Sequence, residues 1–81
     1  MEDVKELKFE IIRKLGVLSD GGRSWRKELN IVAWNEHEPK LDIRDWDAEH
    51  MRMGKGVTLT REEGARLHEY LGSFLKQSPK L

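Results

Sequence analysis

The sequence predicts an α+β fold in which four β-strands are followed by one C-terminal helix. Before residue 60, short stretches alternate apolar with polar side chains, which is the period of a strand with one buried face. After residue 60, apolar side chains recur at helical spacing behind a pattern that begins helices. A chain of 81 residues suffices for one small domain, so we expect a single domain over residues 1–81. Its ordered core is expected over about residues 8–76, with frayed ends at 1–7 and 77–81.

The first two strands are predicted on either side of a glycine-rich turn. KFEIIRKLGVL, residues 8–18, alternates loosely and is expected to be the first strand. In SDGGRS, residues 19–24, two adjacent glycines can take positive φ at little steric cost, which predicts a turn. WRKELNIVAWN, residues 25–35, alternates again and is expected to be the second strand.

KLDIRDW, residues 40–46, is predicted to pair with the second strand as a hairpin. A tight hairpin centred near His37 would place Trp34 opposite Lys40 and Asn30 opposite Arg44. One face is then aliphatic and is expected to pack on a core: Leu29, Ile31, Ala33, Leu41 and Ile43. The other face is polar and aromatic and is expected to point outward: Arg26, Trp34, Lys40, Arg44 and Trp46.

A loop over residues 47–56, a short fourth strand at 57–60 and a helix complete the chain. Thr60 begins a T-R-E-E capping box, in which its hydroxyl caps the amide of Glu63 while Glu63 reaches back to the amide of Thr60. The helix carries one apolar stripe, formed by Leu67, Tyr70, Leu71, Phe74 and Leu75. This stripe is wide for one small sheet, so we expect a homodimer with these five residues at the interface.

Composition argues against several classes of function. The chain has no cysteine, which removes thiol catalysis and thiolate metal sites, and His37, His50 and His68 lack a metal-ligand spacing. The carboxylates lie mostly beside basic residues, and GKG at 54–56 is too short for a phosphate-binding loop. We expect no enzyme activity, cofactor, metal or small-molecule substrate. MEDVKELKFE lacks the apolar segment of a secretion signal, and no apolar run is long enough for a membrane span, so a cytoplasmic protein is expected.

The outward face combines the two kinds of side chain that hold single-stranded nucleic acid. Aromatic rings stack on bases, and Lys or Arg follow the phosphates. Trp34 and Trp46 supply rings on the face that also carries the basic residues. From spacing alone, either tryptophan could instead cover a core edge or a subunit interface, and Trp25 has the parity of the aliphatic face. The net charge is zero, with 15 basic and 15 acidic residues, which is unlike many nucleic-acid-binding proteins.

KFEIIRKLGVLS, WRKELNIVAWN, PKLDIRDW and MGKGVTLT follow one another before the capped helix. This series resembles the transcriptional positive cofactor four family, and most closely its short bacterial YdbC-type branch. The likeness covers about residues 8–76, and its most specific segments are D-I-R-x-W and G-K-G-[VI]-[TS]-L. The resemblance implies a curved antiparallel four-stranded sheet with a C-terminal helix. It also implies a homodimer whose helices and sheet edges form the interface and whose sheet faces bind single-stranded DNA.

The resemblance also assigns roles to individual residues. The stacking aromatics correspond to Trp34 and Trp46. The basic contacts that it implies are Arg26 or Lys27, Lys40, Arg44 and Lys55, and the predicted register adds Asn30, which lies opposite Arg44. The chain lacks the long serine- and lysine-rich N-terminal region of the eukaryotic coactivators, so their phosphorylation control does not carry over.

We therefore expect a non-enzymatic, largely sequence-independent single-stranded DNA-binding protein. We expect it to act in transcription regulation or in DNA replication and repair, with single-stranded RNA as an alternative ligand. The competing hypothesis is a protein-interaction module that uses the same tryptophan-bearing face. The zero net charge is an argument for this second hypothesis.

Overall fold

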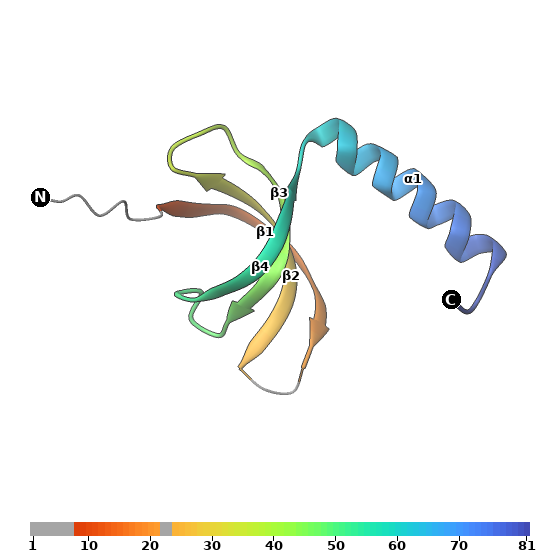
Figure 1. The fold of residues 1–81 in the computed structure, drawn as a ribbon, viewed down its shortest axis with the longest axis horizontal. Coiled ribbons are helices and arrows are strands. Elements are labelled where there is room, and N and C mark those ends of the chain that lie inside the picture. Colours follow the sequence, from red (N-terminus) through yellow and green to blue (C-terminus); the bar gives the residue numbers. More distant parts are fainter. Residues whose placement is uncertain (1–7, 22–23) are drawn as a thin grey trace, which may run out of the picture.

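The computed structural model describes residues 8–21 and 24–81 and confirms the predicted order of elements (Figure 1). The strands are β1 (Phe9–Asp20), β2 (Trp25–Trp34), β3 (Lys40–Asp47) and β4 (Met53–Leu59), and the helix is α1 (Arg61–Gln77). Neighbouring strands pair antiparallel in the order β1-β2-β3-β4, which makes one open, curved sheet. The predicted frayed segment 1–7 and residues 22 and 23 of the predicted turn lie outside the described residues.

The fourth strand begins earlier than the sequence predicted. Met53 to Gly56 belong to β4, so the second half of the predicted loop 47–56 is wrong. Pairing with β3 outweighs the weak strand preference of glycine, and a bulge between the Arg44 and Trp46 pairings accommodates this stretch. The loop is confined to residues 48–52, where the carboxylate of Asp47 accepts hydrogen bonds from two backbone N–H groups.

The β2–β3 hairpin has a different register from the predicted one. Val32, not Trp34, lies opposite Lys40, and Asn30 lies opposite Asp42, not Arg44. The cause is the turn. Residues 35 and 36 both have positive φ, at 50° and 67°, and the N–H of residue 37 donates to the carbonyl of residue 34, which describes a type I′ turn centred before His37. The shift is two residues, so even-numbered residues of both strands still share one face, as predicted.

The assignment of the core to one face was wrong for the single chain. We call the face with the even-numbered residues of β2 and β3 the even face, and the opposite one the odd face. Among the described residues, the buried ones all lie on the even face: Glu28, Asn30, Val32, Asp42 and Trp46. The predicted core residues of the odd face, from Leu29 to Ile43, are only half-buried.

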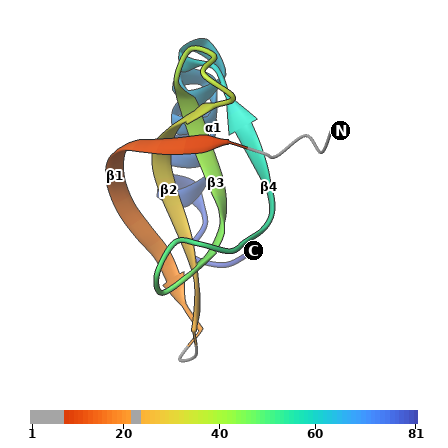
Figure 2. The same ribbon diagram turned by 90° about the vertical axis from the view of Figure 1, so that its left-hand side faces the viewer.

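Sheet curvature explains this reversal. Register shifts divide the β1–β2 ladder at three places, leaving Ile12, Leu15 and Leu18 without a partner on β2. Such bulges bend a strand and increase its twist. The first half of β1 therefore crosses in front of the sheet (Figure 2), and the ring of Phe9 comes within 5.1 Å of Trp46 on the third strand. The even face is therefore the concave face of the curved sheet, and its own side chains are buried there. We call this concavity the cup.

The predicted capping box begins α1 as expected. The hydroxyl of Thr60 accepts from the Glu63 N–H at 3.1 Å, and the Glu63 carboxylate accepts from the Thr60 N–H at 2.8 Å. The helix makes few contacts with the sheet, on β3 and β4, and Gly64 lies against the side chain of Leu41 on the odd face. The rest of α1 projects away from the sheet (Figure 1). Within the described part of the chain, no helix has the length and apolar character needed to span a membrane.

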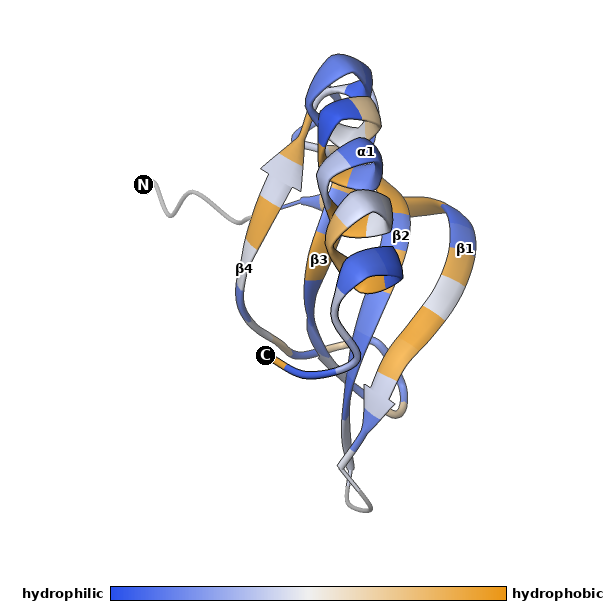
Figure 3. Ribbon diagram, turned by 90° about the vertical axis from the view of Figure 1, so that its right-hand side faces the viewer, coloured by the Kyte–Doolittle hydropathy of each residue, from blue (hydrophilic) through white to orange (hydrophobic). Residues whose placement is uncertain are grey.

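Seen from the helix side, β1 and β4 show hydrophobic stretches on both sides of α1 (Figure 3). Ile12, Val17, Leu18 and Val57 are about half exposed in the single chain. The predicted stripe on α1 is also exposed, from 37% at Phe74 to 66% at Leu75. Contiguous exposed apolar surface of this kind marks a protein interaction site.

Candidate nucleic-acid interface

An aromatic cluster fills the cup on the even face. The centre of the Phe9 ring lies 5.9 Å from the ring centre of Trp34 and 5.1 Å from that of Trp46. The ring centres of Trp46 and His50 are 5.6 Å apart. Trp46 is completely buried, so its predicted outward orientation is wrong. For Trp46, the alternative that the spacing left open, a tryptophan that covers a core edge, is therefore the better description. Trp34 is half-buried and remains partly open to solvent.

Arg44 forms a stacked pair with Trp34. Its guanidinium carbon lies 4.6 Å from the centre of the indole, which is a cation–π arrangement. The Nε of Arg44 donates to both carboxylate oxygens of Asp42, at 2.8 and 3.0 Å, and Asp42 is fully buried. The Nη1 of Arg44 also donates to the carbonyl oxygen of Gly54 at 3.4 Å. The buried acid thus fixes the guanidinium over the indole and balances its charge.

The glycine pattern of β4 contributes to this arrangement. Gly56 pairs with Arg44, and a Cβ at this position would overlap the Arg44 side chain and the Ile43 carbonyl. A larger residue would therefore displace Arg44 from Asp42. The glycines of GKG allow β3 and β4 to approach each other closely, and Lys55 is exposed in the bulged stretch.

The Trp34–Arg44 pair borders an open pocket of about 410 Å³. Its lining comes from the end of β2, the 35–39 loop, β3 and β4: Trp34, His37, Glu38, Lys40, Arg44 and Thr58. The pocket therefore offers an aromatic and guanidinium surface, an exposed ammonium and polar groups together, a combination suited to a nucleobase with its phosphate.

A second, buried polar group lies farther along β2. Glu28 is 4% exposed, and its carboxylate accepts from Asn30 Nδ2 at 3.0 Å and from His50 Nε2 at 2.9 Å. Burial acts to raise the pKa of Glu28, but the hydrogen bonds from Asn30 and His50, with the charges of His50 and Lys14, outweigh it, so this pKa is lowered.

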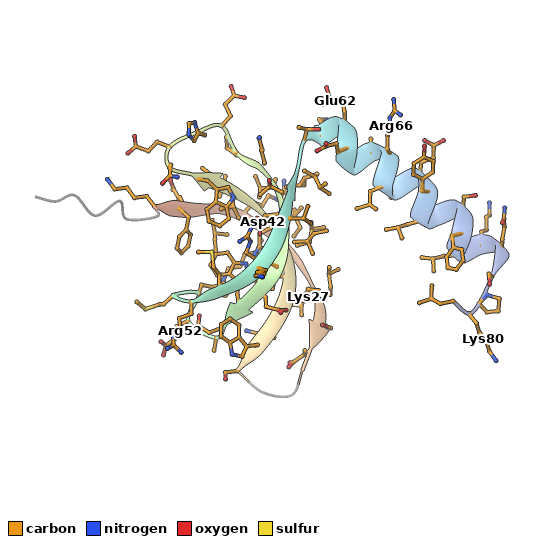
Figure 4. All side chains as sticks on the ribbon, viewed as in Figure 1. Lys27, Asp42, Arg52, Glu62, Arg66 and Lys80 are labelled. Carbon is orange, nitrogen blue, oxygen red and sulfur yellow. The ribbon has the colours of Figure 1, made fainter. Side chains whose placement is uncertain are left out.

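The predicted basic residues are divided between the two faces. Arg26 lies on the even face opposite Trp46 and is half-buried, whereas Lys27 has odd-face parity and is exposed. In Figure 4, Lys27 lies toward the helix side of the sheet, while Asp42 lies near its middle. Of the predicted residues, Trp34, Lys40 and Arg44 come together at the pocket, and Lys27 is separated from it.

The sequence is similar to known proteins over most of its length. Residues 22–70 match the model of the family described as Transcriptional Coactivator p15 (PC4). This chain belongs to the PC4 family. A relative from Treponema pallidum (strain Nichols), described as an uncharacterized protein, is 44% identical over 66 residues, covering 82% of this chain and 78% of the relative. The PC4 family is one of DNA-binding coactivators, so a nucleic acid is the partner class that membership supports.

The PC4 match includes every predicted nucleic-acid-binding residue, from Arg26 to Lys55. Three contributors to this site were not among the predicted residues: Phe9, which lies outside the matched residues, and the buried acids Glu28 and Asp42. A signal existed for Asp42, because D-I-R places acid and base two residues apart on one strand face. No local signal existed for Phe9, because only the bending of β1 brings it over Trp46.

The lowered pKa of Glu28 predicts a pH dependence of stability in this PC4-family chain. The folded state binds the proton less tightly than the unfolded chain, whose pKa is near 4.5. The carboxylate therefore contributes stability that is fully present above about pH 4.5 and is lost as pH falls through the lower, folded pKa. Urea unfolding of Glu28→Gln should show a smaller decrease in the free energy of unfolding below this pH than the parent shows. Parallel curves for parent and variant would contradict this assignment.

Proposed function

We propose that this chain is a non-enzymatic, largely sequence-independent single-stranded DNA-binding protein that acts in transcription regulation or in DNA replication and repair. The observation that carries the proposal is the Trp34–Arg44 pair, held by a buried acid at an open pocket that also contains Lys40. Stacking on such a surface is tolerant of sequence, because every base has a π-face. Membership of the PC4 family, a family of DNA-binding coactivators, supports the same partner class.

The proposed roles of the basic residues follow from their pairing. Asp42 already balances the charge of Arg44, so Arg44 acts with Trp34 as part of the stacking surface. The phosphates are then contacted by exposed Lys40 and Lys55 and by half-buried Arg26. This small number of proposed contacts to the DNA phosphates fits a chain whose net charge is zero.

We also propose that the protein is a symmetric homodimer. The odd face and the helix stripe leave apolar side chains exposed in the single chain, and one small domain has little other core. A second copy offers the same surfaces, so one two-fold contact would cover both helices and place two even faces on one particle.

The decisive experiment measures the binding of labelled oligo-dT and of a duplex of equal length by fluorescence anisotropy at several salt concentrations. We expect a saturable preference for the single strand. Trp34→Ala should weaken binding by roughly 1–3 kcal/mol with little change in the slope of log affinity against log salt. Lys40→Ala should weaken binding and reduce that slope by about 0.7, the value for one phosphate contact on a single strand. Arg44→Ala would also leave the buried Asp42 carboxylate without its partner, so the folding of this variant is checked before its affinity is compared.

The matched control is Trp25→Ala, which removes an exposed indole of odd-face parity from the other end of β2. Its affinity for oligo-dT should stay close to that of the parent. Equal affinity for single strand and duplex, or equal losses in Trp25→Ala and Trp34→Ala, would reject the proposed site. The protein-interaction hypothesis would then be favoured.

A further inference from the structure

We propose that a second hollow on the even face is a subsite for a guanine base. This inference rests on the proposed function, because it describes how one nucleotide of a bound single strand is held. The hollow has a volume of about 290 Å³ and lies between β1, β2 and the 48–52 loop. Its polar lining consists of Lys14, Arg26, Glu28, Asn30 and His50.

The amide of Asn30 is the first observation that points to a ligand. Its Nδ2 donates to Glu28 Oε1 at 3.0 Å, and the opposite orientation would set two acceptors against each other, so the positions of oxygen and nitrogen are fixed. Asn30 is 1% exposed, and in the part of the chain that the structure describes its Oδ1 has no hydrogen-bond partner. A buried acceptor without a partner is unfavourable, so a donor supplied through the hollow would be stabilised there.

The chemistry of the other groups that line the hollow limits which ligand can supply this donor. Glu28 is an acceptor only, and its second oxygen shares the proton of His50 Nε2 at 3.1 Å, which leaves lone pairs available. The interior of the hollow is therefore rich in acceptors. Lys14 and Arg26 are donors only, and each carries a positive charge. The hollow thus fits a ligand with two neighbouring N–H donors, an acceptor and a nearby anionic group.

Among the DNA bases, guanine has this pattern. Its N1–H and N2 amino group are adjacent donors, and its O6 is an acceptor beside them. Adenine and cytosine place a ring acceptor next to the amino group, and thymine has one N–H between two carbonyls. Either arrangement would direct an acceptor at Asn30 Oδ1 or at the Glu28 carboxylate. The phosphate of the same nucleotide would complement Lys14 and Arg26.

The position of the hollow is compatible with a single DNA strand that also stacks on Trp34. Asn30 and Trp34 are four residues apart on β2 and have the same parity, so they share the even face at a separation of about 13 Å along the strand. A single-stranded segment that crosses this face would pass both positions. The stacking surface would hold any base, while the hollow would favour guanine over the other bases.

The test compares three labelled oligonucleotides of equal length by anisotropy with the parent protein: oligo-dT, a repeat of two dT and one dG, and the same repeat with inosine in place of each dG. Inosine is a purine that lacks only the N2 amino group, so it controls for stacking. We expect the dG repeat to bind about tenfold more tightly than the inosine repeat, the size of one good base-edge contact. Asn30→Leu should remove this difference between the dG and inosine repeats.

Equal affinities of the parent for the dG and inosine repeats would overturn the guanine subsite, whether or not Asn30→Leu folds. If oligo-dT binds while dG and inosine are equivalent, the proposed function stands and only this inference fails. If none of the three oligonucleotides binds, both fail. A dG preference that persists in a folded Asn30→Leu variant would place the discrimination elsewhere and would also overturn the inference.

Discussion

Replacing Trp46 with alanine is expected to destabilise the fold by about 3–5 kcal/mol, the typical cost of truncating a buried large aromatic side chain. Trp46 has no exposed surface, and its ring contacts Phe9 and His50 across the cup. The truncation would leave a cavity where β1 closes over β3. Urea unfolding followed by circular dichroism measures the change as a decrease in the midpoint and in the free energy of unfolding.

Trp25→Ala is the matched control, because Trp25 is 38% exposed and lies on the other face of the sheet. Its free energy of unfolding should decrease by much less. Binding of oligo-dT by Trp46→Ala should be measured only where the variant is folded, so that lost stability is separated from a lost contact. A variant with the stability of the parent but weaker binding would return Trp46 to the role that the sequence predicted, a stacking ring.

Replacing Phe74 with glutamate is expected to convert the protein from a dimer to a monomer. Phe74 lies in the apolar stripe of α1, in the C-terminal half of the helix, which projects away from the sheet (Figure 1), and is 37% exposed in the single chain. A carboxylate buried in an apolar dimer interface without a partner carries a desolvation cost of several kcal/mol, which exceeds what the surrounding contacts return. Light scattering at micromolar concentration should give the dimer mass for the parent and half that mass for the variant.

Ser73→Glu provides the matched control, because it adds the same charge at the neighbouring helix position, outside the stripe. It should leave the mass of the dimer unchanged. A monomeric parent, or a Phe74→Glu variant that keeps the parent's mass, would reject the dimer and the arrangement of two even faces on one particle. Loss of the dimer in Ser73→Glu alone would place the interface on another side of α1.

Local patterns were sufficient for the order of the elements, for the bounds of β2 and β3 and for the beginning of the helix. The alternation in residues 25–35 and 40–46 depends only on the two-residue period of a strand, and the two strands formed within one residue of these bounds. The T-R-E-E box depends on contacts between residues three apart, so Thr60 and Glu63 made the predicted hydrogen bonds. The pairing of even with even positions on one face was likewise predictable from parity.

Local patterns did not decide which face is buried or what each site residue does. Alternation shows that a strand has two faces, but the sign of the sheet's curvature depends on bulges in β1, which the sequence does not mark. Bending brought Phe9 over Trp46 and buried Glu28, Asn30 and Asp42 on the face that had been expected to point outward.

The sequence by itself determined the strand and helix order, the family resemblance and the set of aromatic and basic residues near the candidate site, because these depend on residue type and short-range spacing. Only the tertiary structure decided that Trp46 is part of the core and Trp34 part of the pocket. It also decided that Arg44 is paired with a buried acid and that Lys27 lies on the opposite face. The physical reason is that burial and charge pairing arise from contacts between strands, whose register and curvature are set by turns and bulges and not by alternation alone.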